Sequence, residues 1–453
     1  MPGVGERGRG ERAGGGGYGE VSAEGTPGER LADVPRDRVN IPILVHIVAA
    51  VTLPATETPA PVPPQRIRPL RVGMVVVSEY ESDPRVRRQA EALVARGDEV
   101  TVLALDAPGR PEVDIVDGVR VVHLPTRKYR GSSAKAYLSL YGGFGARAAG
   151  WLSRRPRAFD VVQAHSMPEA LVFAAAVPRL FGVPVLLDVH DLTSKLFASK
   201  FADRRKVLAA VSASEKASLR FAREVLTVHE PYADMLRDLT RRPVSVVMNC
   251  PDERLFVPRE RPRGWDPDGE VVFSYHGLIA PRHGLVASTE ALAAIRSDVP
   301  GARLQVRGSG DGLDELRDRV EALGVDVDLP TRLYPLPEIV SELDRVHIGL
   351  IPSQLDPWTD GVLPTKLLEY ASLGIPVITF RNPVIARYFP EDSVRYVDPA
   401  TPQTLAEAMR DLARNPEKAL AQARRATEVM AGLRWSEQKK HYFAVIDRLA
   451  KRA

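Results

Sequence analysis

A lysine and a glutamate stand three residues apart in the segment Asp356–Ile378, DPWTDGVLPTKLLEYASLGIPVI. Pro364 before them suits the first turn of a helix, because its missing N–H would have no partner there. The N–H groups of that turn would face an anion, with support from the helix dipole. Lys366 adds a positive charge, and Glu369 shares its helix face, where a carboxylate can accept hydrogen bonds from two vicinal hydroxyls. This combination suits a nucleotide diphosphate; the alternative is an ordinary exposed Lys–Glu pair.

A second loop with suitable chemistry is YHGLIAPRHG, which follows an apolar run. Gly277 would let backbone amides approach a ligand, and Arg282 can bind a phosphate through two parallel hydrogen bonds. An ordinary glycine-containing loop is the alternative. Gly308-Ser309-Gly310, after the run LQVR, could line the same site or form only a strand-to-helix turn.

No recognisable pattern of metal-binding or redox-cofactor residues is present. The nine histidines include no His-x-x-x-His pair, and the single cysteine, Cys250, excludes a disulfide framework and a Cys-based zinc cluster. The Gly-x-Gly-x-x-Gly fingerprint is absent after the first predicted strand, which argues against a nicotinamide or flavin enzyme. Arg282, Lys366 and the helix end could neutralise a diphosphate themselves, so we expect no cofactor and no metal.

Three histidines end apolar runs in the first half of the chain. His190 ends VPVLLDVH, and the carboxyl end of a parallel strand faces the ligand side of the sheet. There it could bind a sugar hydroxyl or assist proton transfer. His165 and His229 end similar runs and rank lower, and a structural role is the alternative for His190.

The acceptor is expected on the first half of the chain. In the loop SEYESDPRVRRQA, Asp83 or Arg85 could reach an acceptor or a leaving phosphate, although we favour Asp83 as the cap of the helix that Pro84 begins. Residues 127–157 have eight basic and no acidic residues, including Lys128 and Arg130, with aromatic residues such as Trp151 among them.

Residues 194–223 add eight basic residues against two acidic ones. Basic residues with interfacial aromatics suit a lipid acceptor or an anionic membrane surface. A solvated helix face is the alternative, and the aromatics could instead pack into the core. The overall net charge of +4 for 453 residues argues against a nucleic-acid partner.

Strands and helices that alternate along the chain must position these residues. Short β-branched runs such as RVGMVVV and VTVLAL are separated by helical patterns, which indicates repeated βαβ units. The charged, Pro- and Gly-rich linker VPRERPRGWDPDG interrupts the alternation before a second series begins. The sequence predicts an α/β fold of two Rossmann-like, doubly wound domains that face each other across a cleft.

The expected domain organisation follows these boundaries. It comprises a disordered low-complexity extension (1–68), a first Rossmann-like acceptor domain (69–256), a linker (257–269), a second Rossmann-like donor domain (270–435) and a C-terminal helix (436–453) that packs back on the first domain. No stretch reaches the roughly 18–20 apolar residues that a spanning helix needs. We expect a cytoplasmic protein, peripheral on the inner face of the membrane.

The Lys366 segment resembles the donor-binding signature of the family-4 retaining glycosyltransferases of the GT-B fold. The matching residues are Pro364-Thr365-Lys366, Glu369-Tyr370 and Gly374-Ile375-Pro376-Val377, and the resemblance covers residues 71–450. The loops of Arg282 and Lys366 occur in the family's order, about 84 residues apart, which favours the binding interpretation of both.

The resemblance implies roles for individual residues. Glu369 would hold the donor ribose, Arg282 would neutralise the leaving diphosphate, His190 would contact the donor sugar, and Gly308 and Gly310 would lie near the nucleotide. Two positions depart from the family pattern: His283 stands where a lysine is common, and Gly361 where many members carry a glutamate near the transferred sugar. Asp360 or Asp356 is then the acidic group expected to face the sugar.

Together these features predict a retaining hexosyltransferase of the bacterial cell-surface polysaccharide type. It would move a sugar from a nucleotide diphosphate sugar to the hydroxyl of a glycan or lipid-linked acceptor. A nucleotide-sugar epimerase of the same architecture and a non-catalytic nucleotide-sugar-binding protein are the alternatives. A product that forms without any acceptor would indicate the epimerase. Nucleotide binding without turnover would indicate the non-catalytic binding protein.

Overall fold

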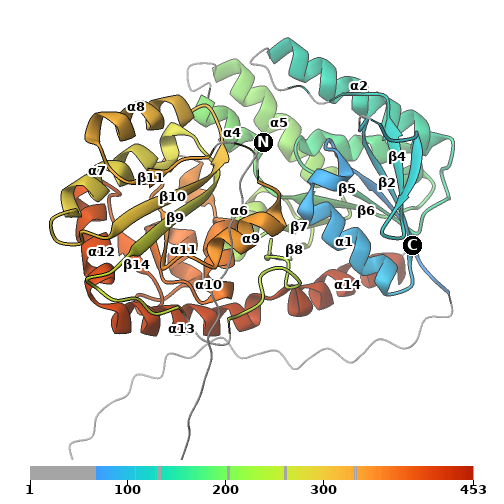
Figure 1. Cartoon of the computed structure of the whole chain (residues 1–453). Helices are drawn as coiled ribbons and strands as arrows, with labels where there is room; N and C mark the ends of the chain where they lie inside the picture. Colours follow the sequence, from blue (N-terminus) through green and yellow to red (C-terminus); the bar gives the residue numbers. More distant parts are fainter. Residues whose placement is uncertain are drawn as a thin grey trace, which may run out of the picture. The chain divides into compact units, whose positions relative to one another are not determined.

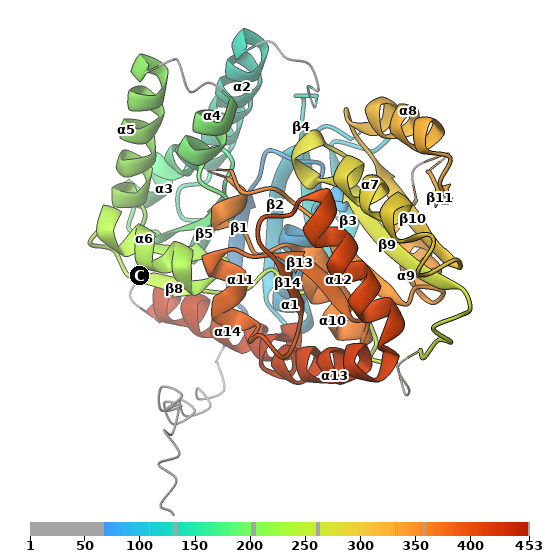
Figure 2. The same cartoon turned by 90° about the vertical axis from the view of Figure 1, so that its left-hand side faces the viewer.

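The computed structural model describes residues 68–451, apart from 108, 128, 130–133, 201–204, 260–262, 331, 333 and 357. The predicted extension 1–68 lies outside the described residues except for Arg68. The described part contains two sheets, each covered by helices (Figures 1 and 2). The prediction of two doubly wound α/β domains is therefore confirmed.

The first sheet has the order β3-β4-β2-β1-β5-β6-β7-β8. Its strands are β1 (Arg71–Val75), β2 (Glu99–Leu105), β3 (Val113–Val116), β4 (Val119–Leu124), β5 (Val161–His165), β6 (Val185–Val189), β7 (Glu224–Thr227) and β8 (Val244–Val246). The central strands β5, β6 and β7 are buried throughout, as near-continuous apolar runs in parallel sheets require.

Strand β3, which the sequence analysis did not anticipate, pairs antiparallel with β4 at the edge of this sheet. Asp117 and Gly118 connect the two strands, both with positive φ, as a two-residue hairpin turn demands.

Helices connect these strands. They are η1 (Tyr80–Ser82), α1 (Pro84–Ala95), α2 (Ala134–Ser153), η2 (Glu169–Ala175), α3 (Ala176–Leu180), α4 (Thr193–Lys200), α5 (Arg205–Phe221) and α6 (Glu230–Leu239). Helix α1 shows why they form: Asp83 accepts a hydrogen bond from Val86 N, Pro84 occupies the first turn, and Val86 and Leu93 are buried on the sheet.

The second sheet is entirely parallel in its pairings, with the order β11-β10-β9-β12-β13-β14. Its strands are β9 (Val271–Leu278), β10 (Ala302–Ser309), β11 (Val327–Asp328), β12 (Ile348–Ile351), β13 (Val377–Phe380) and β14 (Arg395–Val397). The strand order reverses between β9 and β12, and ligands bind at the carboxyl ends of strands beside such a reversal.

The second domain's helices are η3 (Pro281–His283), α7 (Leu285–Ile295), α8 (Leu313–Leu323), α9 (Leu336–Leu343), η4 (Thr359–Gly361), α10 (Thr365–Leu373), α11 (Pro383–Tyr388), α12 (Pro402–Arg414) and α13 (Pro416–Leu433). Pro364 is the N-cap residue of α10 rather than a member of its first turn. None of the helices within the described ranges is both long and apolar enough to cross a membrane.

The last helix, α14 (Trp435–Lys451), belongs to the core of the first domain. Tyr442, Ile446 and Leu449 are buried in one cluster with Val72 and Leu93. The chain therefore crosses between the two domains twice, once before β9 and once after α13. Hydrogen bonds join the two crossing segments. Cys250 Sγ lies 2.7 Å from the carbonyl oxygen of Leu433, and Ser436 Oγ lies 3.0 Å from Glu253 Oε1.

Gly308 and Gly310 lie where β10 runs against the end of β9. A Cβ atom at Gly308 would lie 1.8 Å from the carbonyl oxygen of Gly277, and one at Gly310 would lie 1.9 Å from that of Ile279. Both distances are far below contact, and the blocking atoms are backbone. The close approach of β10 to the end of β9 therefore explains the two glycines, a reason different from the strand-to-helix turn considered as the alternative, and their position near the nucleotide stays a prediction.

We expect Gly310→Ala to lower the free energy of unfolding by at least about 2 kcal/mol, because a Cβ there must displace backbone. Urea unfolding followed by circular dichroism measures the change. The control is Gly145→Ala inside α2, where nothing lies within 4 Å of the added Cβ. This second variant should be neutral or up to about 1 kcal/mol more stable. Equal stability of the two variants would contradict the packing argument.

Candidate active site

Lys366 lies in the first turn of α10 and reaches the end of β9. Its Nζ is 3.3 Å from Tyr275 Oη and 4.5 Å from the centre of the Tyr275 ring. A Cβ built on Gly277 would lie 3.5 Å from the same Nζ. Burial lowers the pKa of Lys366 to about 8, although Glu369 opposes this shift. The structure thus brings Lys366 and the Gly277 turn together.

Glu369 follows one turn later on the same helix face and is held by a histidine. Its Oε2 lies 2.5 Å from His276 Nε2, and His276 Nδ1 lies 3.0 Å from Tyr370 Oη. The side chain of Glu369 is 15% exposed, so the carboxylate stays accessible from one side. His276 was not among the predicted site residues, although it lies next to Gly277 in the predicted binding loop.

Arg282 lies in η3, and its guanidinium stacks 4.9 Å from the centre of the Trp358 ring. Its Nε is buried and has no hydrogen-bond partner among the residues that the structure describes. His283, which replaces a lysine of the family pattern, points elsewhere: its Nδ1 lies 2.6 Å from the carbonyl oxygen of Leu278. Burial and the charge of Lys366 lower the pKa of His283, so it adds no positive charge at neutral pH.

The two acidic candidates before α10 have different environments. Asp356 Oδ1 accepts hydrogen bonds from the N–H groups of Trp358 (2.7 Å) and Thr359 (2.6 Å), so it braces η4. Asp360 is exposed, as is Thr365 at the start of α10. Gly361 is buried against the first domain, where Lys195 and Tyr232 lie close to its α-carbon.

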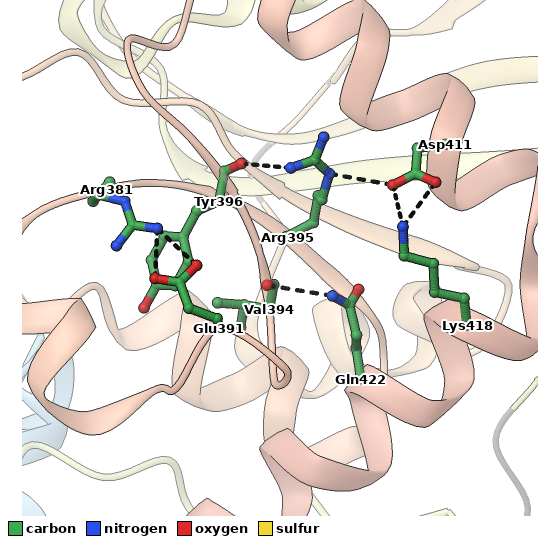
Figure 3. A pocket seen from close by; sticks show the side chains of 8 residues that line it. All are labelled: Arg381, Glu391, Val394, Arg395, Tyr396, Asp411, Lys418 and Gln422. Atoms are coloured by element: carbon green, nitrogen blue, oxygen red, sulfur yellow. Dashed lines mark hydrogen bonds and ion pairs between the residues drawn. The ribbon is translucent and has the colours of Figure 1, made fainter.

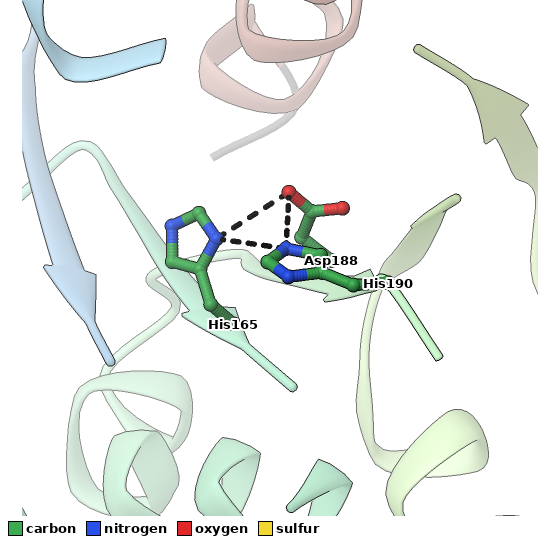
Figure 4. A group of neighbouring side chains, drawn as sticks. All are labelled: His165, Asp188 and His190. Atoms are coloured by element: carbon green, nitrogen blue, oxygen red, sulfur yellow. Dashed lines mark hydrogen bonds and ion pairs between the residues drawn. The ribbon is translucent and has the colours of Figure 1, made fainter. Parts of the chain in front are cut away.

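His190 follows β6 directly and takes part in a buried network (Figure 4). Its Nε2 lies 3.3 Å from Asp188 Oδ2, and His165 Nδ1 lies 3.4 Å from the same oxygen. The His190 side chain is 20% exposed, whereas His165 and Asp188 are fully buried. His190 can therefore meet a ligand, and His165 is a structural histidine.

The prediction that Arg85 reaches an acceptor or a leaving phosphate is wrong for this structure. Its guanidinium is buried and bonds Asp188 through Nε (3.1 Å) and Nη2 (2.7 Å). Burial alone would raise the pKa of Asp188, but Arg85 and His190 outweigh it and hold that pKa well below its usual range. A buried carboxylate needs such a partner, which explains why an arginine stands on the inner face of α1.

Asp188, His165 and His190 also place three possible ligand atoms within 4.8 Å of one another, a spacing compatible with a metal ion. The oxygens of Asp188 are already bonded by Arg85 and by Gln89 Nε2 (2.8 Å). These donors already supply the positive charge and the hydrogen bonds that a metal would otherwise provide. We therefore assign the group as an ion-pair network.

The remaining acceptor-side residues do not assemble into one site. Asp83 caps α1 and accepts a hydrogen bond from Ser78 Oγ (2.9 Å), as its alternative interpretation predicted. Trp151 packs on Phe159 with the ring centres 6.2 Å apart, at the core of the first domain. Trp151 is only partly buried there, so it packs against the core and its role on the acceptor side stays a prediction. Lys128 and Arg130 lie outside the described residues.

An open cavity of about 410 Å³ lies at the β14 edge of the second sheet (Figure 3). Its cations are already paired: Arg381 with Glu391 at 2.6 Å, and Arg395 and Lys418 with Asp411 at 3.3 and 2.7 Å. None of the predicted site residues lines this cavity. His190, Gly277 and Lys366 lie instead at the carboxyl ends of β6 and β9 and at the start of α10.

Comparison with known proteins identifies the family of both domains. Residues 82–252 match the family model described as a glycosyl transferase 4-like domain, and residues 258–429 match that of the glycosyl transferases group 1. A 2-deoxystreptamine N-acetyl-D-glucosaminyltransferase of Streptomyces fradiae is 30% identical over 323 residues, which cover 65% of this chain and 72% of that protein.

Two solved structures share the fold. Sucrose-phosphate synthase from Thermosynechococcus elongatus superposes with a TM-score of 0.68 at 17% identity, covering 85% of this chain and 100% of the other. An Anabaena protein in complex with UDP gives a TM-score of 0.60 at 13% identity, covering 84% and 100%. The two matched domains and the 30% identical relative show the family of this chain. It belongs to the glycosyltransferases that combine a glycosyl transferase 4-like domain with a glycosyl transferases group 1 domain, and it is an enzyme of the GT-B fold that transfers sugars.

Proposed function

We propose that the donor is a nucleotide diphosphate sugar held by α10 and the β9–η3 loop. The observation that carries this proposal is the position of Lys366, whose ammonium lies against the Gly277 turn one helical turn before Glu369. Here a diphosphate would meet Lys366, Arg282 and the backbone N–H groups that begin α10. His276 bonds Oε2 of Glu369, and the second carboxylate oxygen would receive the ribose hydroxyls.

The proposed reaction depends on electrostatic stabilisation of the leaving group. Negative charge develops on the diphosphate as the bond to the sugar breaks, and preorganised cations lower the energy of that state. Lys366 and Arg282 would supply this charge without a metal ion. The acceptor hydroxyl would attack from the face that the diphosphate leaves, so that the anomeric configuration is retained.

His190 would contact the transferring sugar. Its Nε2 faces Asp188, so that its Nδ1 edge is the one that a sugar hydroxyl would meet. Asp360 is exposed beside Gly361 and is the acidic side chain that stays free to approach the sugar or acceptor. Uridine is the first nucleotide to test, because an Anabaena protein of the same fold is described in complex with UDP.

We also propose that the acceptor is a cell-surface glycan or its lipid-linked precursor and that the first domain docks on an anionic membrane. Support comes from a basic–apolar patch made of Leu180 and Phe181 with Arg157, which stacks on Phe181, and Arg179, which precedes Leu180. Leu180 is 85% and Phe181 48% exposed, and the Arg157 guanidinium lies 5.1 Å from the Phe181 ring centre. Exposed apolar side chains ringed by arginines suit an anionic lipid surface.

Lys366→Ala and Glu369→Ala should each lower sugar transfer by at least about 10-fold, because each removes a charged contact of about 1.5–3 kcal/mol. Initial rates with a nucleotide sugar measure the loss, and the Glu369 variant should lose donor affinity as well. Each rate is taken with and without EDTA, and the proposal requires that chelation leave it unchanged.

The matched control for these variants is Lys440→Ala on α14, whose only described bonds are to Glu437. It should retain the wild-type rate. Near-wild-type transfer by a folded Lys366→Ala protein would exclude the proposed donor site.

Donor binding should weaken as the pH rises through about 8. Below that value Lys366 is an ammonium ion, and above it the side chain loses the charge that attracts the diphosphate. Titration calorimetry with UDP between pH 6.5 and 9.5 should show a dissociation constant that rises toward 10-fold per unit above pH 8. The Lys366→Ala protein should show no such rise; the same slope in both proteins would exclude Lys366 as its source.

The membrane proposal is tested by sedimentation with vesicles of phosphatidylglycerol or of phosphatidylcholine. Wild type should bind the anionic vesicles, and Leu180→Ser with Phe181→Ser should weaken this binding by about 10-fold or more. The control changes the exposed apolar residues of β3, Val113→Ser with Ile115→Ser, and should bind like wild type. Equal binding to both lipids would refute the electrostatic part of the proposal.

A further inference from the structure

The first turns of α4 and α6 in the first domain meet η4 of the second domain at Gly361. A Cβ atom built on Gly361 would lie 2.8 Å from Lys195 Nζ and 3.2 Å from Tyr232 Oη. Lys195 lies in the first turn of α4 and Tyr232 in the first turn of α6. A cation and a hydroxyl from separate helices therefore converge on one point, which the missing side chain of Gly361 leaves open to them.

Neither polar group is satisfied by the residues that the structure describes. Tyr232 is 1% exposed, and its hydroxyl has no hydrogen-bond partner there. Lys195 forms no ion pair in the described part of the chain, and its Nζ lies 5.5 Å from the centre of the Tyr232 ring. A buried hydroxyl without a partner is destabilising, so its presence here is explained if a ligand supplies the missing hydrogen bond.

His229 adds a third donor beside them. Its Nδ1 accepts a hydrogen bond from the N–H of Tyr232 (3.2 Å), which places the ring proton on Nε2. That Nε2 is buried and forms no hydrogen bond of good geometry among the described residues, although the backbone of Gly361 lies close enough to raise the pKa of the ring. Burial lowers the pKa of His229 to about 4, so the ring is a neutral donor at physiological pH.

Two buried carboxylates fix the position of Lys195. Glu169 accepts hydrogen bonds from the N–H of Thr193 (2.9 Å) and from its hydroxyl (2.5 Å), and Glu215 accepts one from the N–H of Ser194 (3.2 Å). Both glutamates are 3% exposed. The start of α4 is thus tied to η2 and α5, which is unlike the setting of a mobile surface lysine.

We propose that Lys195, Tyr232 and His229 form a subsite for an anionic oxygen of a substrate, a carboxylate or a phosphate. The inference rests on the proposed function, because Lys195 follows His190 by five residues and Gly361 precedes Lys366 by five residues. Two sources supply such an oxygen. One is an acidic sugar in the donor, such as a hexuronate, and the other is a phosphate or carboxylate on the acceptor.

Paired ligands that differ only in the anionic group test the proposal by titration calorimetry. The donor arm compares UDP-glucuronate with UDP-glucose. The acceptor arm compares glucose 6-phosphate with glucose, each added to protein saturated with UDP and also to protein without it. In one arm the anionic ligand should bind at least about 10-fold more tightly than its neutral partner.

Lys195→Met should abolish this preference and leave the neutral ligand unaffected. Tyr232→Phe, which removes one hydroxyl and keeps the ring, should reduce it several-fold. The control is Lys216→Met, at an exposed lysine of α5, which should keep the wild-type preference. Circular dichroism verifies that each variant is folded.

Two outcomes would overturn the proposal: no preference for the anionic ligand in either arm, or a preference that survives Lys195→Met. The second outcome includes a Lys195→Met protein that is less thermally stable than wild type but prefers the anionic ligand to the same degree. That result would show that Lys195 only contacts the other domain and does not bind the ligand. Failure of the wild-type protein to bind UDP would instead refute the proposed donor site. The comparison of glucose 6-phosphate with glucose in the absence of UDP would then still test the subsite.

Discussion

The buried ion pair between Arg85 and Asp188 is the interaction on which the rest of the first domain depends. It joins α1 to β6, and a third bond, from Arg85 Nη1 to the carbonyl oxygen of Val247 (2.9 Å), reaches the segment after β8. Burying one of these charges alone would be strongly destabilising, so each element is held in place by the others. Asp188 in turn is the group against which His190 is oriented. The position of the partly exposed His190 ring is thereby linked to the packing of the core.

The network extends to the end of the chain. Tyr442 of α14 donates a hydrogen bond to Gln163 Oε1 (2.7 Å), and Gln163 Nε2 donates to Gln89 Oε1 (2.6 Å). Gln89 Nε2 then donates to Asp188. A buried chain of this kind is stable only when each member has its partner, which makes it sensitive to the position of α14. The second domain, by contrast, leaves the side chains of Glu369 and Arg282 partly exposed.

Much of the fold followed from local patterns, because buried parallel strands are short apolar runs and the helices between them have clear caps. Strand β3 was missed because it is a short strand at the edge of the sheet, with residues that alternate between exposed and half-buried. Strand β11 was missed because it has only two residues, too few to show a periodic pattern. In the site, Lys366 and Glu369 could be placed together because they share one helix face. Arg85 could not be placed, since its partner lies 103 residues away and only the folded sheet brings them together. Gly361 was noticed in the sequence, but the meeting of Lys195 and Tyr232 at this glycine could not be predicted, because it depends on how two domains pack.

The return of α14 to the first sheet means that this domain is not one continuous stretch of sequence. Tyr442, Ile446 and Leu449 close a core that begins with Val72, and the whole second domain lies between them in the chain. During synthesis, which proceeds from the N-terminus, the ribosome must release the second domain before the first can complete its core. The domain that is made first is thus the last to be finished, and until then the apolar face that receives α14 is open to water or to a chaperone.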